Sequence, residues 1–236
     1  MNHEKLSLRL ERVAIHIPEG SILADIGSDH AYLPCYAVKK GLVKKAIAGE
    51  VSEGPYQSAC NKVSETGLGE HIAVRKGDGL EVLSPGEATA ISIAGMGGTL
   101  ISSILENGKT KLSNVNKLIL QPNVGANHVR MWLIENGWEL VDEEILEEDG
   151  KIYEILAAEP GDPLKPYGEE KESGLLFGPF LMKERNDAFI KRWTLEKEHW
   201  KKISGQLSAV ALNPETEERR NVLLARIKMA EEALGI

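Results

Sequence analysis

The sequence predicts an α/β fold: a mostly parallel sheet that ends in an antiparallel hairpin and is followed by a C-terminal helical hairpin. Short apolar runs alternate with helical patterns through the first 136 residues, which is typical of a parallel sheet with crossover helices. Each of the first four apolar runs ends in a turn that contains glycine together with Asp, Glu or Met. Beyond residue 168 the strand patterns stop and apolar residues recur at heptad spacing. These three observations define the expected fold class.

The first strand is expected over residues 22–26, a nearly continuous apolar run of the kind found in strands buried on both faces. Gly27 turns the chain, and Ser28 or Asp29 is expected to cap the helix that follows. A helix that begins in this way directs unpaired amides and the positive end of its dipole at whatever lies over the turn. The stretch is therefore a candidate anion or nucleotide site, although an ordinary strand-to-helix connection has the same pattern.

The next three strands place similar turns at the same edge of the sheet. Residues 46–48 end at Gly49-Glu50, residues 72–74 at 77–79, and residues 90–93 at 94–98. Ligands of open parallel sheets bind beyond the carboxyl ends of the strands, and an acid roughly 20 residues after the glycine turn holds the ribose in nucleotide-binding units. Glu50 stands at that position. The pattern favours a nucleotide-like ligand.

The remaining elements follow in alternation. A fifth strand, residues 118–120, ends at Gln121-Pro122-Asn123. Two strands over 138–146 and 151–158, with Asp149-Gly150 between them, indicate a hairpin. Helices are expected over residues 6–17, 30–40, 56–63, 100–105 and 128–136. Arg9, on the first of these helices, could reach the ligand turn, but a surface position is equally compatible with the pattern.

A segment rich in Pro and Gly between residues 160 and 168 marks a domain boundary. We therefore expect a catalytic domain over residues 1–161, and a link with a helical domain over 162–236. Asn213-Pro214 is typical of a helix start, so the tail is expected to be two antiparallel, coiled-coil-like helices. Two apolar seams define them: Phe189, Trp193, Trp200, Ile203 and Leu207, and then Leu223, Ile227, Ala230 and Leu234.

Composition narrows the function classes. The 236 residues carry a formal net charge of −8, which opposes binding to a polyanion, but residues 183–202 hold seven basic and four acidic side chains. Cys35 and Cys60 form no CxxC pair, and the six histidines lack metal-ligand spacing, so no metal is expected. With neither a signal peptide nor a membrane-spanning run in the sequence, we expect a cytoplasmic protein. Nothing in the sequence fixes the oligomeric state; a monomer is the simplest expectation.

Five segments together resemble the bacterial tRNA adenine-N1 methyltransferases that act on adenine 22, which have a class I, Rossmann-like fold. The segments are residues 25–34, 48–50, 77–80, 94–98 and 120–123, and Gly-Ser-Asp-His-Ala-Tyr and Ala-Gly-Met-Gly-Gly are the most specific sequences among them. The resemblance implies S-adenosylmethionine as the methyl donor and tRNA as the substrate. It also implies that the helical tail takes part in tRNA binding.

By this resemblance, the residues after the first strand line the methionine end of the cofactor, Glu50 accepts from the ribose and Asp78 meets the adenine. The implied cofactor residues are Asp25, Gly27, Ser28, Asp29, Glu50, Val51, Asp78, Gly79, Ala94, Gly95 and Met96. Asp29, His30, Tyr32 and Asn123 are candidates for holding the target adenine. Lys191, Arg192, Lys201 and Lys202 flank the aromatic seam of the tail and are candidates for RNA binding.

Two other functions remain compatible with the residues. A dinucleotide-dependent oxidoreductase would use Glu50 equally well, although the closing hairpin and the Gly77-Asp78-Gly79 turn argue against it. A catalytically silent RNA-binding protein that keeps the cofactor as a structural ligand is the second, because no obligatory base or nucleophile marks the chemistry.

Overall fold

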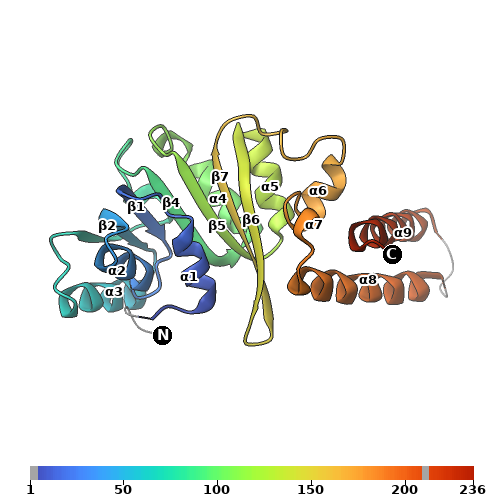
Figure 1. The fold of residues 1–236 in the computed structure, drawn as a ribbon, viewed down its shortest axis with the longest axis horizontal. Coiled ribbons are helices and arrows are strands. Elements are labelled where there is room, and N and C mark those ends of the chain that lie inside the picture. Colours follow the sequence, from blue (N-terminus) through green and yellow to red (C-terminus); the bar gives the residue numbers. More distant parts are fainter. Residues whose placement is uncertain (1–4, 209–212) are drawn as a thin grey trace. The chain divides into compact units, whose positions relative to one another are not determined.

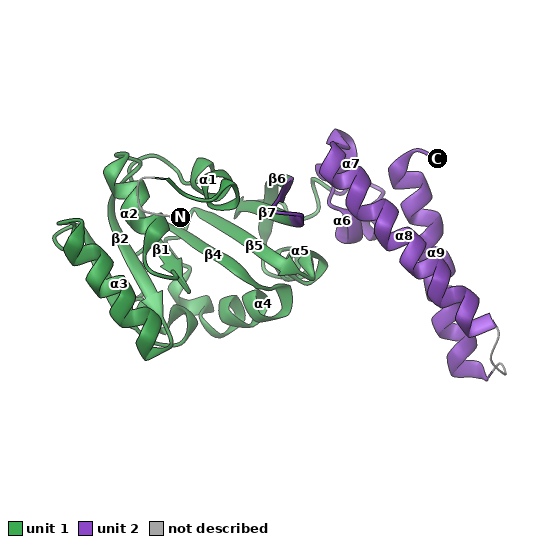
Figure 2. Cartoon of the chain, turned by 90° about the horizontal axis from the view of Figure 1, so that it is seen from below, with its two compact units in different colours: residues 1–144, 153–166 green, residues 145–152, 167–236 purple. Residues whose placement is uncertain are grey.

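The computed structural model describes residues 5–208 and 213–236, and these form two compact units. Unit 1 contains residues 1–144 and 153–166, and unit 2 contains residues 145–152 and 167–236 (Figure 2). The tip of the β6–β7 hairpin therefore packs with the C-terminal helices rather than with the rest of its own sheet.

Unit 1 is built on a seven-stranded sheet in the order β3-β2-β1-β4-β5-β7-β6 (Figure 1). The first five strands are parallel, and β7 pairs antiparallel with β5. The expected sheet and its closing hairpin are confirmed. The strands are β1 (Ser21–Ile26), β2 (Val43–Glu50), β3 (Ile72–Lys76), β4 (Ala90–Gly97), β5 (Lys117–Val124), β6 (Trp138–Glu148) and β7 (Lys151–Pro160).

Helices cover both faces of the sheet: α1 and α2 lie on one face, and α4 and α5 on the other (Figure 2). The helices of unit 1 are α1 (Leu8–Ile15), α2 (Tyr32–Lys39), α3 (Glu53–Glu65), α4 (Gly98–Asn107) and α5 (Ala126–Glu135), with short 3-10 turns η1 (Gly79–Val82) and η2 (Lys109–Lys111). Because the central strands are buried on both sides, Leu23, Ile91 and Ile119 are wholly inaccessible. The rigid sheet fixes where its carboxyl edge presents the polar turns.

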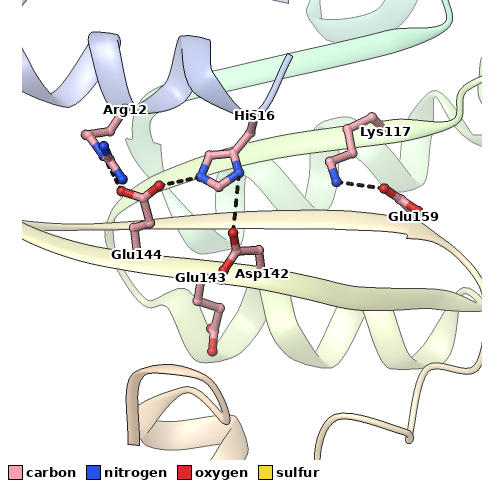
Figure 3. A network of polar contacts seen from close by, with 7 residues as sticks. All are labelled: Arg12, His16, Lys117, Asp142, Glu143, Glu144 and Glu159. Atoms are coloured by element: carbon pink, nitrogen blue, oxygen red, sulfur yellow. Dashed lines mark hydrogen bonds and ion pairs between the residues drawn. The ribbon is translucent and has the colours of Figure 1, made fainter. Parts of the chain in front are cut away.

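The hairpin turn at Asp149-Gly150 forms as the sequence predicts. Both residues have positive φ angles, 50° and 73°, which is the backbone that a two-residue hairpin turn requires. On β6 the side chains alternate between the two faces of the sheet. Asp142 and Glu144 face α1, while Glu143 points away from it (Figure 3).

One local expectation is wrong. The second helix was expected from residue 30, with Ser28 or Asp29 as its cap, but α2 begins at Tyr32 and neither side chain caps it. Asp29, His30 and Ala31 instead take left-handed backbone angles, with φ of 42°, 69° and 54°. Such angles cost of order 1–3 kcal/mol each for residues other than glycine and cluster at functional sites. The Ser28 hydroxyl is used elsewhere, and the Asp29 side chain faces solvent.

Unit 2 contains the helical hairpin and the segment that leads to it. Its helices are α6 (Lys171–Phe177), α7 (Leu181–Glu184), α8 (Asp187–Ser208) and α9 (Pro214–Leu234). Asn213 caps α9 by accepting from the Thr216 amide at 2.8 Å, as the Asn-Pro pair predicts. Residues 209–212, which connect the two long helices, lie outside the described residues.

The aromatic seam of α8 forms, but its second half differs from the expected heptads. Phe189, Trp193 and Trp200 are buried, and the next buried residue is Ser204, whereas Ile203 and Leu207 are only partly covered. On α9 the buried residues are Ile227, Ala230 and Ala233 rather than Leu223 and Leu234. Ile227 and Ala230 are therefore buried as predicted, whereas the small side chains of Ser204 and Ala233 occupy buried positions outside the predicted seams.

Within residues 5–208 and 213–236, no helix combines the length and the apolar composition that a membrane crossing requires.

Candidate functional site

The carboxyl ends of β1, β4 and β5 enclose a cavity of about 340 Å³. It is lined by Arg9, Leu10, Asp25, Gly27, Ser28, Asp29, Leu33, Ala94, Gly95, Met96, Asn123 and Tyr153. Seven of the predicted cofactor residues and two of the predicted target-binding residues meet here, with Asp29 counted in both groups. The position agrees with the rule that open parallel sheets bind ligands beyond the carboxyl ends of their strands.

Asp25 is the buried carboxylate of this cavity, with 4% of its surface exposed. The Ser28 hydroxyl donates to one carboxylate oxygen at 2.6 Å, and the Ser92 hydroxyl donates to the other at 2.7 Å. Ser92 reaches Asp25 because the two residues are register partners on β1 and β4. Burial raises the pKa of Asp25 above its ordinary value, although the two hydroxyls and the Arg9 charge act in the opposite direction.

Gly27 makes the first turn, as the sequence predicts. Its φ is 69°, and a Cβ on it would lie 2.2 Å from the Met96 methyl group. The left-handed backbone favours glycine at this position, and a larger residue would also displace the Met96 side chain from the cavity wall.

The loop after Gly27 is held by Glu50 from the end of β2. The Asp29 amide donates to Glu50 Oε1 at 2.5 Å, although 21 residues separate the two in sequence. Burial raises the pKa of Glu50, and the bond from the Asp29 amide partly offsets this. The Asp29 side chain remains 76% exposed beside the cavity, 3.4 Å from His30 Nε2. The strained loop thus presents the Asp29 carboxylate to solvent, while its backbone is held by the Glu50 carboxylate.

Asp78 and Gly79 line a second, smaller hollow of about 110 Å³ with Ile104 and Lys111. Asp78 also forms a reciprocal capping box with Glu81 at the start of η1. Its carboxylate therefore has a structural role in addition to the predicted adenine contact.

Four predicted cofactor or target residues lie outside both hollows: Glu50, Val51, His30 and Tyr32. Glu50 is buried and holds the Asp29 amide, and Val51 after it is 60% exposed. The His30 and Tyr32 rings lie 5.5 Å apart between centroids, tilted by 36°. Their predicted roles stay predictions.

Sequence reasoning missed three polar or aromatic residues that shape the large cavity. Gln121, fully buried, accepts from the Gly95 amide at 3.0 Å, and Ser92 binds Asp25. Gln121 and Ser92 are polar residues next to apolar residues of a strand, and this pattern could have indicated a polar role in the site. Tyr153 comes from β7, so only the antiparallel pairing with β5 brings it to this edge.

The four predicted RNA-binding residues lie on α8, but two of them are engaged in ion pairs. Lys191 contacts Glu147 at 2.6 Å, and Lys201 contacts Glu231 at 3.3 Å and Glu198 at 3.5 Å. Arg192 lies over the Trp193 ring at 5.3 Å, and Lys202 is exposed. Lysines that are paired with acids attract a polyanion less strongly than the number of basic residues in the sequence suggests.

The family model described as tRNA (adenine(22)-N(1))-methyltransferase matches residues 23–232. The tRNA (adenine(22)-N(1))-methyltransferase of Bacillus subtilis is 52% identical over 235 residues, which are 99% of each chain. The chain belongs to this family. Family membership supports the methyltransferase interpretation and neither of the two alternatives.

Solved structures agree with this assignment. The crystal structure of the B. subtilis m1A22 tRNA methyltransferase has a TM-score of 0.96 and 51% identity, covering 98% of this chain and 99% of that one. A Streptococcus pneumoniae protein solved in complex with S-adenosyl-L-methionine has a TM-score of 0.86 and 45% identity, covering 98% and 100%. These similarities extend through the C-terminal helices as well as the sheet.

Proposed function

We propose that this protein transfers a methyl group from S-adenosylmethionine to N1 of adenine 22 in tRNA. The observation that carries the proposal is the carboxylate-bearing cavity at the sheet edge, found in a chain 52% identical to a tRNA (adenine(22)-N(1))-methyltransferase along its whole length. The fold, the position of the cavity and the family membership all agree with this activity.

The residues of the cavity fit the cofactor. S-adenosylmethionine carries a sulfonium and an ammonium group, and the cavity offers the carboxylates of Asp25 and Asp29 to these cations. We assign Glu50, at the end of β2, to the ribose hydroxyls, and Asp78 with Gly79, in the smaller hollow, to the adenine. When bound, the cofactor supplies an electrophilic methyl group.

Methyl transfer to adenine N1 does not require a general base. Adenine N1 is a neutral ring nitrogen with a lone pair, so it can attack the methyl group in line without first losing a proton. The contribution of the enzyme is then to hold N1 and the methyl carbon together in the correct orientation. Asn123 and Asp29, which line the cavity, are our candidates for holding the base, with His30 and Tyr32 after Asp29 in the chain.

N1 is occupied by pairing in a duplex, so the target adenine must be unpaired or turned out of the stack. We assign the grip on the rest of the tRNA to the α8–α9 hairpin, because residues 183–236 carry a net charge of +2 while the remainder of the chain carries −10. Lys202, which is exposed, is the leading candidate on α8, since Lys191 and Lys201 are paired with acids. A tRNA substrate also places the enzyme in the cytoplasm, and we expect it to act as a monomer.

The test is to map N1-methyladenine in tRNA from cells with the active protein and from cells that carry an Asp25→Ala variant. We expect methylation at position 22 only with the active protein. An unchanged methylation pattern would refute the proposal.

A further inference from the structure

Gln121 is the centre of a hydrogen-bond chain that ends at the mouth of the cavity. Its side-chain oxygen accepts from Arg9 Nη1 at 2.5 Å and from the Gly95 amide at 3.0 Å. Both groups are obligate donors, so the oxygen of this amide must face them and its nitrogen must face the other way. The buried environment makes the opposite orientation costly, because it would leave donors facing a donor.

The Gln121 amide and the Gly95 carbonyl together set the orientation of Asn123. Gln121 Nε2 donates to Asn123 Oδ1 at 3.3 Å, and Asn123 Nδ2 donates to the Gly95 carbonyl at 2.8 Å. One hydrogen on Nδ2 and one lone pair on Oδ1 remain for another partner. An asparagine amide can bind adenine through N6 and N7, which leaves N1 unoccupied. If Asn123 were reversed, its donor and acceptor would exchange places and no longer match that edge.

Arg9 is itself fixed in place from two sides. Its guanidinium lies over the Tyr153 ring, 5.4 Å from the centroid. One and two turns further along α1, Arg12 and His16 contact carboxylates of β6 (Figure 3). The His16 ring lies 2.8 Å from Glu144 and 3.8 Å from Asp142. These contacts anchor the helix that carries Arg9 over the cavity.

We propose that Arg9 is a positioning residue for methyl transfer, which acts by holding the Gln121 amide in the one orientation that presents Asn123 correctly to the target adenine. The inference rests on the proposed function and names a determinant of adenine recognition at the same site. An arginine suits this role because it remains protonated at every relevant pH and can only donate. Its charge does not need to touch the base or the methyl group.

The test uses three single variants of the full chain and the Arg9→Met, Gln121→Glu double variant. Arg9→Met removes the donor and keeps the length, Arg9→Lys keeps a charged donor, and Gln121→Glu cannot donate to Asn123. We measure the single-turnover rate with saturating S-adenosylmethionine and saturating tRNA, the affinity for each, and the melting temperature. Lys40→Met is the matched control, because Lys40 lies over the Tyr36 ring at 5.7 Å, away from the cavity residues.

Arg9→Met and Gln121→Glu should each slow the single turnover by about tenfold or more with cofactor affinity near that of the wild type. Arg9→Lys should restore part of the rate, and the double variant should be little slower than either single one, because both changes disrupt the same chain. Lys40→Met should match the wild type.

Two results would overturn the proposal. A raised tRNA dissociation constant with a shallower salt dependence and a normal saturated rate would make Arg9 a phosphate contact. A lower melting temperature with a normal saturated rate would make it a purely structural residue. Failure of the proposed function is distinguishable from both, because the wild-type protein itself would then not methylate the tRNA.

Discussion

Glu50 holds the backbone of Asp29: the carboxylate at the end of β2 accepts from the amide of the loop after β1 at 2.5 Å. The loop has three consecutive left-handed residues, so its conformation depends on such outside contacts. The same carboxylate is our candidate for the cofactor ribose. On this assignment, one side chain links cofactor binding to the conformation of the loop that we propose to hold the target base.

We predict that Glu50→Gln weakens binding of S-adenosylmethionine by about tenfold or more, equivalent to about 1.4 kcal/mol. Glutamine can still accept from the Asp29 amide, so the loop is retained while the charged acceptor for ribose hydroxyls is lost. Asp78→Ala should weaken binding by a similar factor. Calorimetric titration measures both. Glu53→Gln is the control, since Glu53 is an exposed residue three positions after Glu50 that pairs with Lys76. Unchanged cofactor affinity in both test variants would contradict the assignment.

Asp25→Asn should affect thermal stability and cofactor affinity in different ways. The pKa of Asp25 is raised by burial, so its ionised form costs folding free energy at neutral pH. Asparagine removes that charge and can still bond with Ser28 and Ser92. We expect the variant to melt at or above the wild-type temperature at pH 7 while its cofactor affinity falls.

The pH dependence provides the check on Asp25. As the pH falls through the raised pKa of Asp25, the wild-type side chain takes up a proton and is no longer penalised, so any stability advantage of the variant should shrink. Thermal unfolding from pH 7 downward measures this. An advantage that grows as the pH falls, or a cofactor affinity equal to that of the wild type, would contradict the account.

Asp29→Ala and Asn123→Ala should lower the rate of methyl transfer more than they lower cofactor affinity, because the lost contacts position the base. Rates by single turnover and affinities by calorimetry on the same preparations test this. Asn116→Ala, at an exposed position before β5, is the control. Wild-type rates in both cavity variants would remove these residues from the target-binding role.

The sequence predicted the sheet because its signals are local. Apolar strands, glycine turns and the Asp149-Gly150 hairpin each depend on a few neighbouring residues. Glu50 followed from its position at a strand end, and Asp25 was assigned by resemblance to the family. The approach of the Met96 methyl group to Gly27 could not be predicted, because Met96 comes from another strand. The same holds for Tyr153, which reaches the cavity only through antiparallel pairing.

Predictions from the sequence failed where tertiary contacts override local preference. Serine is a common helix-capping residue, but the Ser28 hydroxyl donates to the buried Asp25 carboxylate instead. The helix α2 therefore begins without a side-chain cap. The count of basic residues in the tail was correct, but a sequence does not reveal that Lys191 and Lys201 are opposed by acids on β6 and on α8 and α9.

The helical hairpin should contribute salt-dependent tRNA affinity. We expect replacement of Lys191, Arg192, Lys201 and Lys202 by Gln to weaken tRNA binding and to flatten its dependence on salt, because fewer counterions are released. Lys202→Gln alone should account for more of the change than Lys191→Gln. Lys44 and Lys45, replaced by Gln at the exposed start of β2, are the matched control. Coincident binding curves for all of these proteins would show that tRNA docks elsewhere.

The central claim is tested most directly with the purified protein, labelled S-adenosylmethionine and an unmodified tRNA transcript. The modified base is identified and its position is mapped after a single turnover. We predict one N1-methyladenine, at position 22, and no label in a transcript that carries guanine at that position. Label at another atom or another position, or equal labelling of both transcripts, would contradict the account.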